Sequence, residues 1–141
     1  MVKAFRILVV GLLLLMAGIA CDKENYQVVP YVPVYLEINL NLVNELMVPG
    51  NSLYFGNQGY AGIVVYCFEP GSTYYAYDAA CTHELSTTCK VKNEGVLATC
   101  SCCGSQFLLM GEAYPSKGPA TFPLQPYRTS VMGNRLLIYN R

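Results

Sequence analysis

Cys81-Thr82-His83 and Cys100-Ser101-Cys102-Cys103-Gly104-Ser105 are the two stretches that decide the fold of this 141-residue chain. They contain four of its seven cysteines and its only histidine, and sixteen residues separate His83 from Cys100. Each stretch offers two closely spaced side chains of the kinds that bind iron or zinc. Glycine after the last cysteine permits a tight turn with backbone N–H groups near the sulfurs. We therefore predict two facing loops whose metal-binding residues are Cys81, His83, Cys100 and Cys103.

Short strands surround these loops in the predicted fold. Apolar residues alternate along 32–40, which indicates a half-buried strand, and 62–68 and 74–77 are short apolar segments typical of strands. Residues 128–132 and 135–139 form a predicted hairpin around Gly133-Asn134. Many short strands, frequent turns and no convincing helix in the mature chain predict an all-β sandwich or barrel.

The two loops resemble those of the Rieske iron–sulfur family. That family carries C-x-H in one loop and C-x-x-H-G-S in the next, at the spacing seen here. Ser105-Gln106-Phe107 matches the family's Ser-x-Phe/Tyr, Gly118-Pro119-Ala120 its proline loop, and Pro123-Leu124 with Tyr127 its returning strand. The resemblance is specific over residues 78–139. It implies a Rieske-like domain over 31–141 with cluster-binding loops at 78–125.

The resemblance also implies roles for individual residues. Cys81 and Cys100 would bind the inner iron of a [2Fe-2S] cluster, and His83 would bind the outer iron. Cys103 stands where the family has its second histidine. Two imidazoles raise the potential of such a cluster to about −150 to +300 mV, against about −400 mV with four thiolates. A site with three cysteines and one histidine should therefore have a lower potential than a true Rieske centre.

The resemblance also implies a disulfide between two of the remaining cysteines. High-potential Rieske domains join their two loops by a disulfide, and Cys102 occupies one of its positions. The other position would be Ser86, but Cys89 lies only three residues further on. Cys89 and Cys102 are thus the candidate pair, and Cys67, in an apolar strand, is expected to be a buried free thiol.

Two alternatives to the iron–sulfur cluster stay open. Three cysteines and one histidine also form a common closed zinc site, which would make the domain a structural or binding module. In an oxidising compartment the cysteines could instead form disulfides with no metal, and six mature cysteines allow fifteen pairings. The histidine inside C-T-H favours a metal, because a disulfide scaffold has no need of it.

The N-terminus predicts export. Lys3 and Arg6 precede a 14-residue apolar segment, 7–20, which is too short to span a bilayer comfortably and fits a secretory signal peptide over residues 1–20. Ala17-Gly18-Ile19-Ala20-Cys21 resembles the lipobox of bacterial lipoproteins, with Gly18 where leucine is usual. Lipid on Cys21 would anchor a tether, residues 21–30, to a bacterial membrane. The segment has no twin-arginine pair, so export would use the Sec route, and iron would enter after export.

The net charge and the motifs of the chain argue against nucleic-acid binding and against catalysis. The whole chain is formally neutral, and without the signal segment acidic side chains exceed basic ones by two, so nothing favours nucleic-acid binding. No nucleophile–base pair suggests a catalyst. The expected function is one-electron transfer with an unidentified redox partner protein, with the His83 edge as the entry and exit for the electron.

Overall fold

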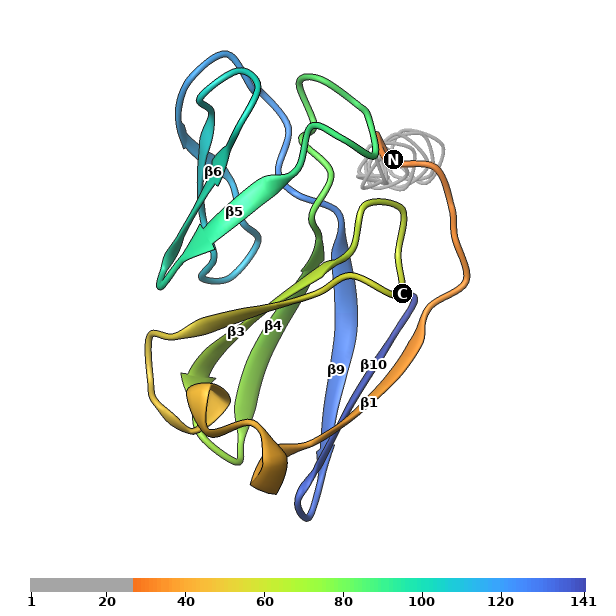
Figure 1. The fold of residues 1–141 in the computed structure, drawn as a ribbon, viewed down its shortest axis with the longest axis vertical. Coiled ribbons are helices and arrows are strands. Elements are labelled where there is room, and N and C mark those ends of the chain that lie inside the picture. Colours follow the sequence, from red (N-terminus) through yellow and green to blue (C-terminus); the bar gives the residue numbers. More distant parts are fainter. Residues whose placement is uncertain (1–26) are drawn as a thin grey trace, which may run out of the picture.

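A computed structural model describes residues 27–141, which fold into ten strands arranged in two antiparallel sheets (Figure 1). The large sheet has the order β1-β10-β9-β4-β3-β2 and the small sheet the order β5-β6-β7-β8. The strands of the large sheet are β1 (Tyr35–Asn39), β2 (Ser52–Phe55), β3 (Ile63–Glu69), β4 (Thr73–Asp78), β9 (Pro126–Met132) and β10 (Arg135–Tyr139). Those of the small sheet are β5 (Val91–Glu94), β6 (Leu97–Cys100), β7 (Gln106–Leu108) and β8 (Pro115–Lys117).

The two ends of the domain pair with each other at one edge of the large sheet. β1 pairs with β10, with Tyr35 opposite Tyr139 and Asn39 opposite Arg135. The residues on the predicted inner face of this segment are buried or half-buried, whereas the intervening residues are exposed. The strand itself begins only at Tyr35, because Pro33 has no N–H to donate to a ladder. Two 3₁₀ turns, Leu40–Leu42 and Asn44–Met47, follow it.

Strand β3 is buried on both of its faces, which explains its uninterrupted apolar sequence. Ile63, Val65 and Cys67 face a core enclosed by the large sheet. Val64 and Tyr66 face a second core that the large sheet shares with the small one. A strand covered on both sides reads as a continuous apolar segment rather than an alternating one.

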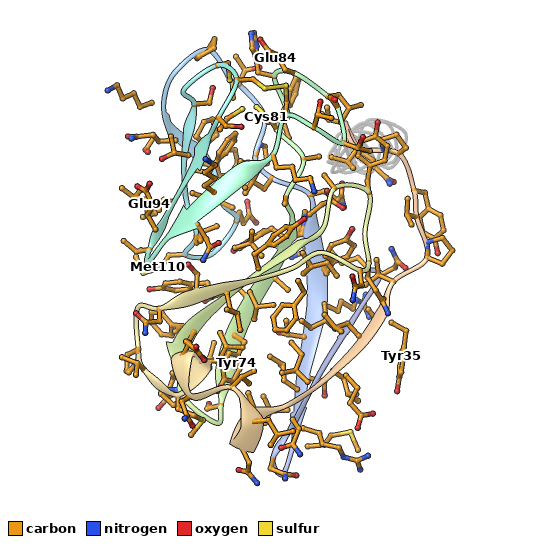
Figure 2. The ribbon with its side chains drawn as sticks, viewed as in Figure 1. Tyr35, Tyr74, Cys81, Glu84, Glu94 and Met110 are labelled. Atoms are coloured by element: carbon orange, nitrogen blue, oxygen red, sulfur yellow. A yellow bond between two sulfur atoms is a disulfide. The ribbon has the colours of Figure 1, made fainter. Side chains whose placement is uncertain are left out.

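The small sheet rises from one end of the large sheet and is inserted between β4 and β9 along the chain (Figure 1). Its inward residues, among them Val91, Ala98 and Phe107, pack in the shared core. The loop after β4 and the loop after β6 lie together at the end of the molecule far from the β9–β10 hairpin, and Cys81 marks this end in Figure 2.

The all-β architecture predicted from the sequence is confirmed, including the β9–β10 hairpin. Cys67 is buried and free, as expected. The predicted signal peptide, the lipid site Cys21 and most of the tether lie outside the described residues. No helix within residues 27–141 is long and apolar enough to cross a membrane.

Candidate metal site

The first cysteine loop leaves β4 directly after Asp78 and closes on itself at residue 89. Cys81 N–H donates to the carbonyl of Cys89 at 3.1 Å, and Val91 N–H donates to the carbonyl of Ala79 at 2.8 Å. The backbone N–H groups of His83 and Glu84 point at the Cys81 sulfur. These two donors favour the thiolate, which is the form that binds metals, and they partly offset the effect of burial on this sulfur.

The second loop is a tight turn at the end of β6. Gly104 N–H donates to the carbonyl of Cys100 at 3.0 Å, and Cys100 N–H donates to the carbonyl of Ser105 at 2.8 Å. Gly104 has a φ of +73°, a left-handed conformation that glycine adopts without steric cost. This turn brings Cys103 back above Cys100.

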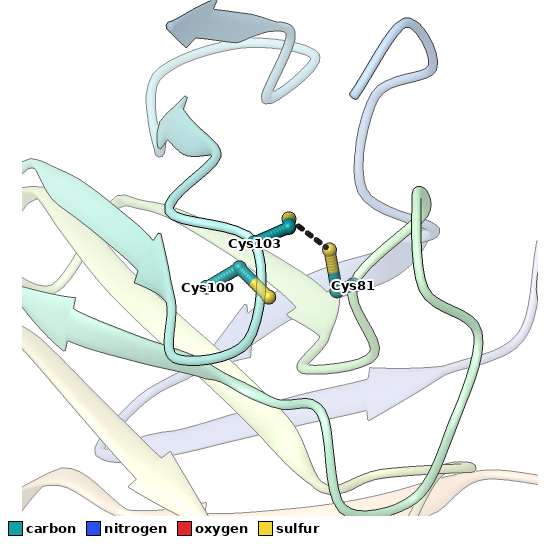
Figure 3. A group of neighbouring side chains, drawn as sticks. All are labelled: Cys81, Cys100 and Cys103. Atoms are coloured by element: carbon teal, nitrogen blue, oxygen red, sulfur yellow. Dashed lines mark hydrogen bonds between the residues drawn. The ribbon is translucent and has the colours of Figure 1, made fainter. Parts of the chain in front are cut away.

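Three of the four predicted ligands converge between these loops (Figure 3). The sulfurs of Cys81, Cys100 and Cys103 lie within 4.8 Å of one another, and those of Cys81 and Cys103 are 3.5 Å apart. Cys81 and Cys100 are buried, and Cys103 is half-buried. Thiolates are the preferred ligands of iron–sulfur clusters and bind zinc strongly, so the donor set fits either group.

The fourth predicted ligand, His83, is placed differently. Its side chain is exposed on the outer part of the first loop, and it does not belong to the group of mutually close ligand atoms. His83 follows Cys81 by two residues and therefore lies on the same loop.

The surroundings of Cys81 and Cys103 shift the pKa values of the two thiols in opposite directions. Burial raises the pKa of Cys81 to about 12, against the lowering effect of the Glu84 and His83 N–H groups. Burial would also raise the pKa of Cys103, but hydrogen bonds from the Ser105 hydroxyl, the Ser105 backbone N–H and the Cys81 and Cys100 thiols together outweigh burial and lower that pKa. The surroundings therefore favour deprotonation of Cys103 over deprotonation of Cys81.

A covering segment, residues 118–124, closes over both loops. Ala120 N–H donates to Ser105 Oγ at 3.0 Å, and Thr82 Oγ1 donates to the Phe122 carbonyl at 2.7 Å. Gly118 passes so close to Ser105 that a Cβ at this position would meet the Ser105 Cα at 2.5 Å. The segment that resembles the family's proline loop is thus fixed to residues next to the cysteines of both loops.

A disulfide joins the outer parts of the two loops. Cys89 and Cys102, the pair suggested by the family resemblance, are bonded with a Cα–Cα distance of 5.5 Å. Ser101 N–H adds a hydrogen bond to the carbonyl of Lys90 at 3.3 Å. A cross-link that closes a loop of this size contributes about 3 kcal/mol in chain-entropy terms.

The base of the site depends on a residue that the sequence did not single out, Asp78. Its buried carboxyl group accepts hydrogen bonds from Tyr60 N–H at 2.6 Å, Ala61 N–H at 3.1 Å, Ala80 N–H at 2.9 Å and Tyr127 Oη at 2.8 Å. Burial and then Asp78 itself raise the pKa of Tyr127, so the phenol remains a donor. The only sequence signal was an acidic residue inside an apolar stretch.

Comparisons with known proteins bear on the fold. A chain of the "complex of reduced oxygenase and oxidized ferredoxin in carbazole 1,9a-dioxygenase" has a TM-score of 0.56 and 21% identity, covering 77% of this chain and 94% of that one. The ferredoxin of carbazole 1,9a-dioxygenase from Nocardioides aromaticivorans IC177 has a TM-score of 0.51 and 19% identity. The match covers 79% of this chain and 100% of the ferredoxin chain. The chain matches no protein-family model and no curated protein. The Rieske-like fold is thereby supported.

Replacing Asp78 by alanine should destabilise the domain by about 3–5 kcal/mol, because four donors lose a buried acceptor. Tyr127→Phe, which removes only one of these bonds, should cost about 1–3 kcal/mol. Urea unfolding of the three proteins gives both values. Asp78→Ala within 1 kcal/mol of the parent would show that the carboxyl group does not support the loop.

Proposed function

We propose that the protein is an exported, membrane-anchored Rieske-like protein that binds a [2Fe-2S] cluster for one-electron transfer. The observation that carries the proposal is the convergence of Cys81, Cys100 and Cys103 between two loops of a fold shared with ferredoxins. In this proposal the three cysteines and His83 hold the cluster, as the sequence resemblance implies. When bound, the cluster supplies one reversible electron per cycle.

The surroundings of the sulfurs suit such a role. Ser105 Oγ lies 3.1 Å from Cys103 Sγ, and because this oxygen already accepts the Ala120 N–H, its hydrogen is free to point at the sulfur. Donors directed at ligand sulfurs stabilise the reduced, more negative state. The covering segment 118–124 is tied to both loops by hydrogen bonds, and exposed His83 would face a partner.

The proposed partner is an unidentified redox protein that exchanges electrons with the cluster. One structural neighbour comes from a complex of an oxygenase with a ferredoxin, which supports a protein as electron donor or acceptor. The His83 side of the loops is the proposed contact. No nucleic acid is expected to take part.

Export and anchoring form a separate part of the proposal, which rests on the sequence. The signal-like segment 1–20 would direct Sec export, and Cys21 would carry the lipid that holds the domain at a bacterial membrane, on the periplasmic or surface face. Mass spectrometry of the mature N-terminus would detect a lipidated Cys21. A mature chain that begins elsewhere would overturn this part.

A structural zinc site is the second candidate, and one observation favours it. The three sulfurs lie close enough together to serve a single ion, which zinc would bind tetrahedrally at Zn–S distances of about 2.3 Å. The fourth ligand would be His83. The domain would then be a binding module rather than an electron carrier.

Purified protein distinguishes these candidates. We expect iron in the protein, broad absorption between about 400 and 600 nm, and an EPR signal after reduction. Cys100→Ala should lose all three, and Cys67→Ala, which removes a buried thiol far from the loops, should retain them. A colourless protein with one zinc per chain would favour the second candidate, and a protein with neither metal would contradict both.

Ser105→Ala should lower the reduction potential by an amount on the order of tens of millivolts, because the ligand sulfur loses a hydrogen bond of typical strength. The matched control is Ser101→Ala, since this hydroxyl is in the same loop but contacts the Lys90 carbonyl. Redox titration followed by EPR measures both. Equal potentials in the two variants would mean that Ser105 does not act on the site.

A further inference from the structure

A second site lies beside the metal loops, in the seam between the two sheets. β2 and β5 are the edge strands that meet there, and the figure shows β5 on the side of the small sheet nearest the large one (Figure 1). A cavity of about 300 Å³ occupies the seam. The residues that line it are Tyr54, Thr88, Lys90, Val91, Lys92, Asn93 and Ser101.

The charge of this cavity is positive and unbalanced. Lys90 and Lys92 both line it, and none of its lining residues is acidic. Within residues 27–141 the one ion pair joins Arg135 to Glu37, so neither lysine has a carboxylate partner. A concave surface with two ammonium groups of this kind raises the local concentration of anions.

One of the two ammonium groups is held in position. Lys90 Nζ donates to Tyr54 Oη at 2.9 Å and lies 5.4 Å from the centre of the Tyr54 ring. Tyr54 Oη in turn donates to the Ala61 carbonyl at 2.9 Å, which fixes the phenol. Because an ammonium group has three donors, Lys90 keeps further N–H groups for a ligand.

From this geometry we infer that the cavity binds an oxyanion, the carboxylate or phosphate group of a small molecule. The Lys90 and Lys92 ammonium groups supply the charge and the free N–H donors, and Ser101 lines the cavity beside them. Tyr54 and Val91 supply an apolar wall for the rest of such a molecule, and the volume lies at the lower end of the range for small-ligand pockets. The inference does not depend on which group the cysteines hold.

The position of the site links it to both metal loops. Thr88 and Lys90 flank Cys89, and Ser101 lies between Cys100 and Cys102. A bound oxyanion would therefore contact the segments that the disulfide joins. It would place a negative charge next to the loops without contacting the three free sulfurs.

Amide NMR shifts of the purified protein test the inference, with inorganic phosphate and acetate as probes, titrated against chloride at constant ionic strength and pH. We expect saturable shifts at Lys92, Asn93 and Ser101 with at least one probe. Lys90→Gln should raise the apparent Kd about fivefold, and the double variant with Lys92→Gln should abolish saturation. Tyr54→Phe, which keeps the charge but frees the ammonium group, should raise it about twofold.

Lys117→Gln is the matched control, because Lys117 is an exposed lysine on β8 outside the cavity. It should bind the probe as the parent does. Shifts that chloride reproduces, or equal Kd values in Lys90→Gln and Lys117→Gln, would overturn the inference. Saturation by phosphate but not acetate, or the reverse, supports it and identifies the preferred oxyanion.

Discussion

A single buried carboxyl group, that of Asp78, holds together the three segments that position the first cysteine loop. It accepts hydrogen bonds from the β2–β3 loop, from the first residues of the first cysteine loop and from Tyr127 on β9. These segments are distant in sequence, and each would otherwise leave a polar group buried without a partner. The carboxyl group therefore sets where Cys81 leaves the large sheet.

The upper part of the site is held by different means. The Cys89–Cys102 disulfide and the Ser101–Lys90 hydrogen bond join the two loops at their outer side, and Ser105 joins the second loop to the covering segment. The loops that carry the sulfurs are thus held by the Asp78 hydrogen bonds where they leave the large sheet and by the Cys89–Cys102 disulfide at their outer side. Such a shell fixes ligand positions before any metal enters, which lowers the cost of binding it.

Periodicity and turn residues were enough to predict the all-β class, the terminal hairpin and a strand over 62–68, which is β3 in the structure. They did not predict β2 or the individual strands of the small sheet, because segments of three or four residues carry too few apolar positions for a period. Spacing predicted that Cys81, Cys100 and Cys103 belong to facing loops, and the structure brings their three sulfurs close together. It did not indicate Asp78 or the Lys90 cavity, since both depend on contacts between residues far apart in the chain.

We propose that Cys81, His83, Cys100 and Cys103 together hold a two-iron cluster, and the sharpest test is Mössbauer spectroscopy of oxidised, ⁵⁷Fe-labelled protein. One iron would have two thiolate ligands and the other a thiolate and an imidazole. We therefore expect two inequivalent ferric signals of equal area, and His83→Cys should make the two irons alike. A single kind of iron in the parent protein, or no bound iron, would show that these four residues do not hold such a cluster.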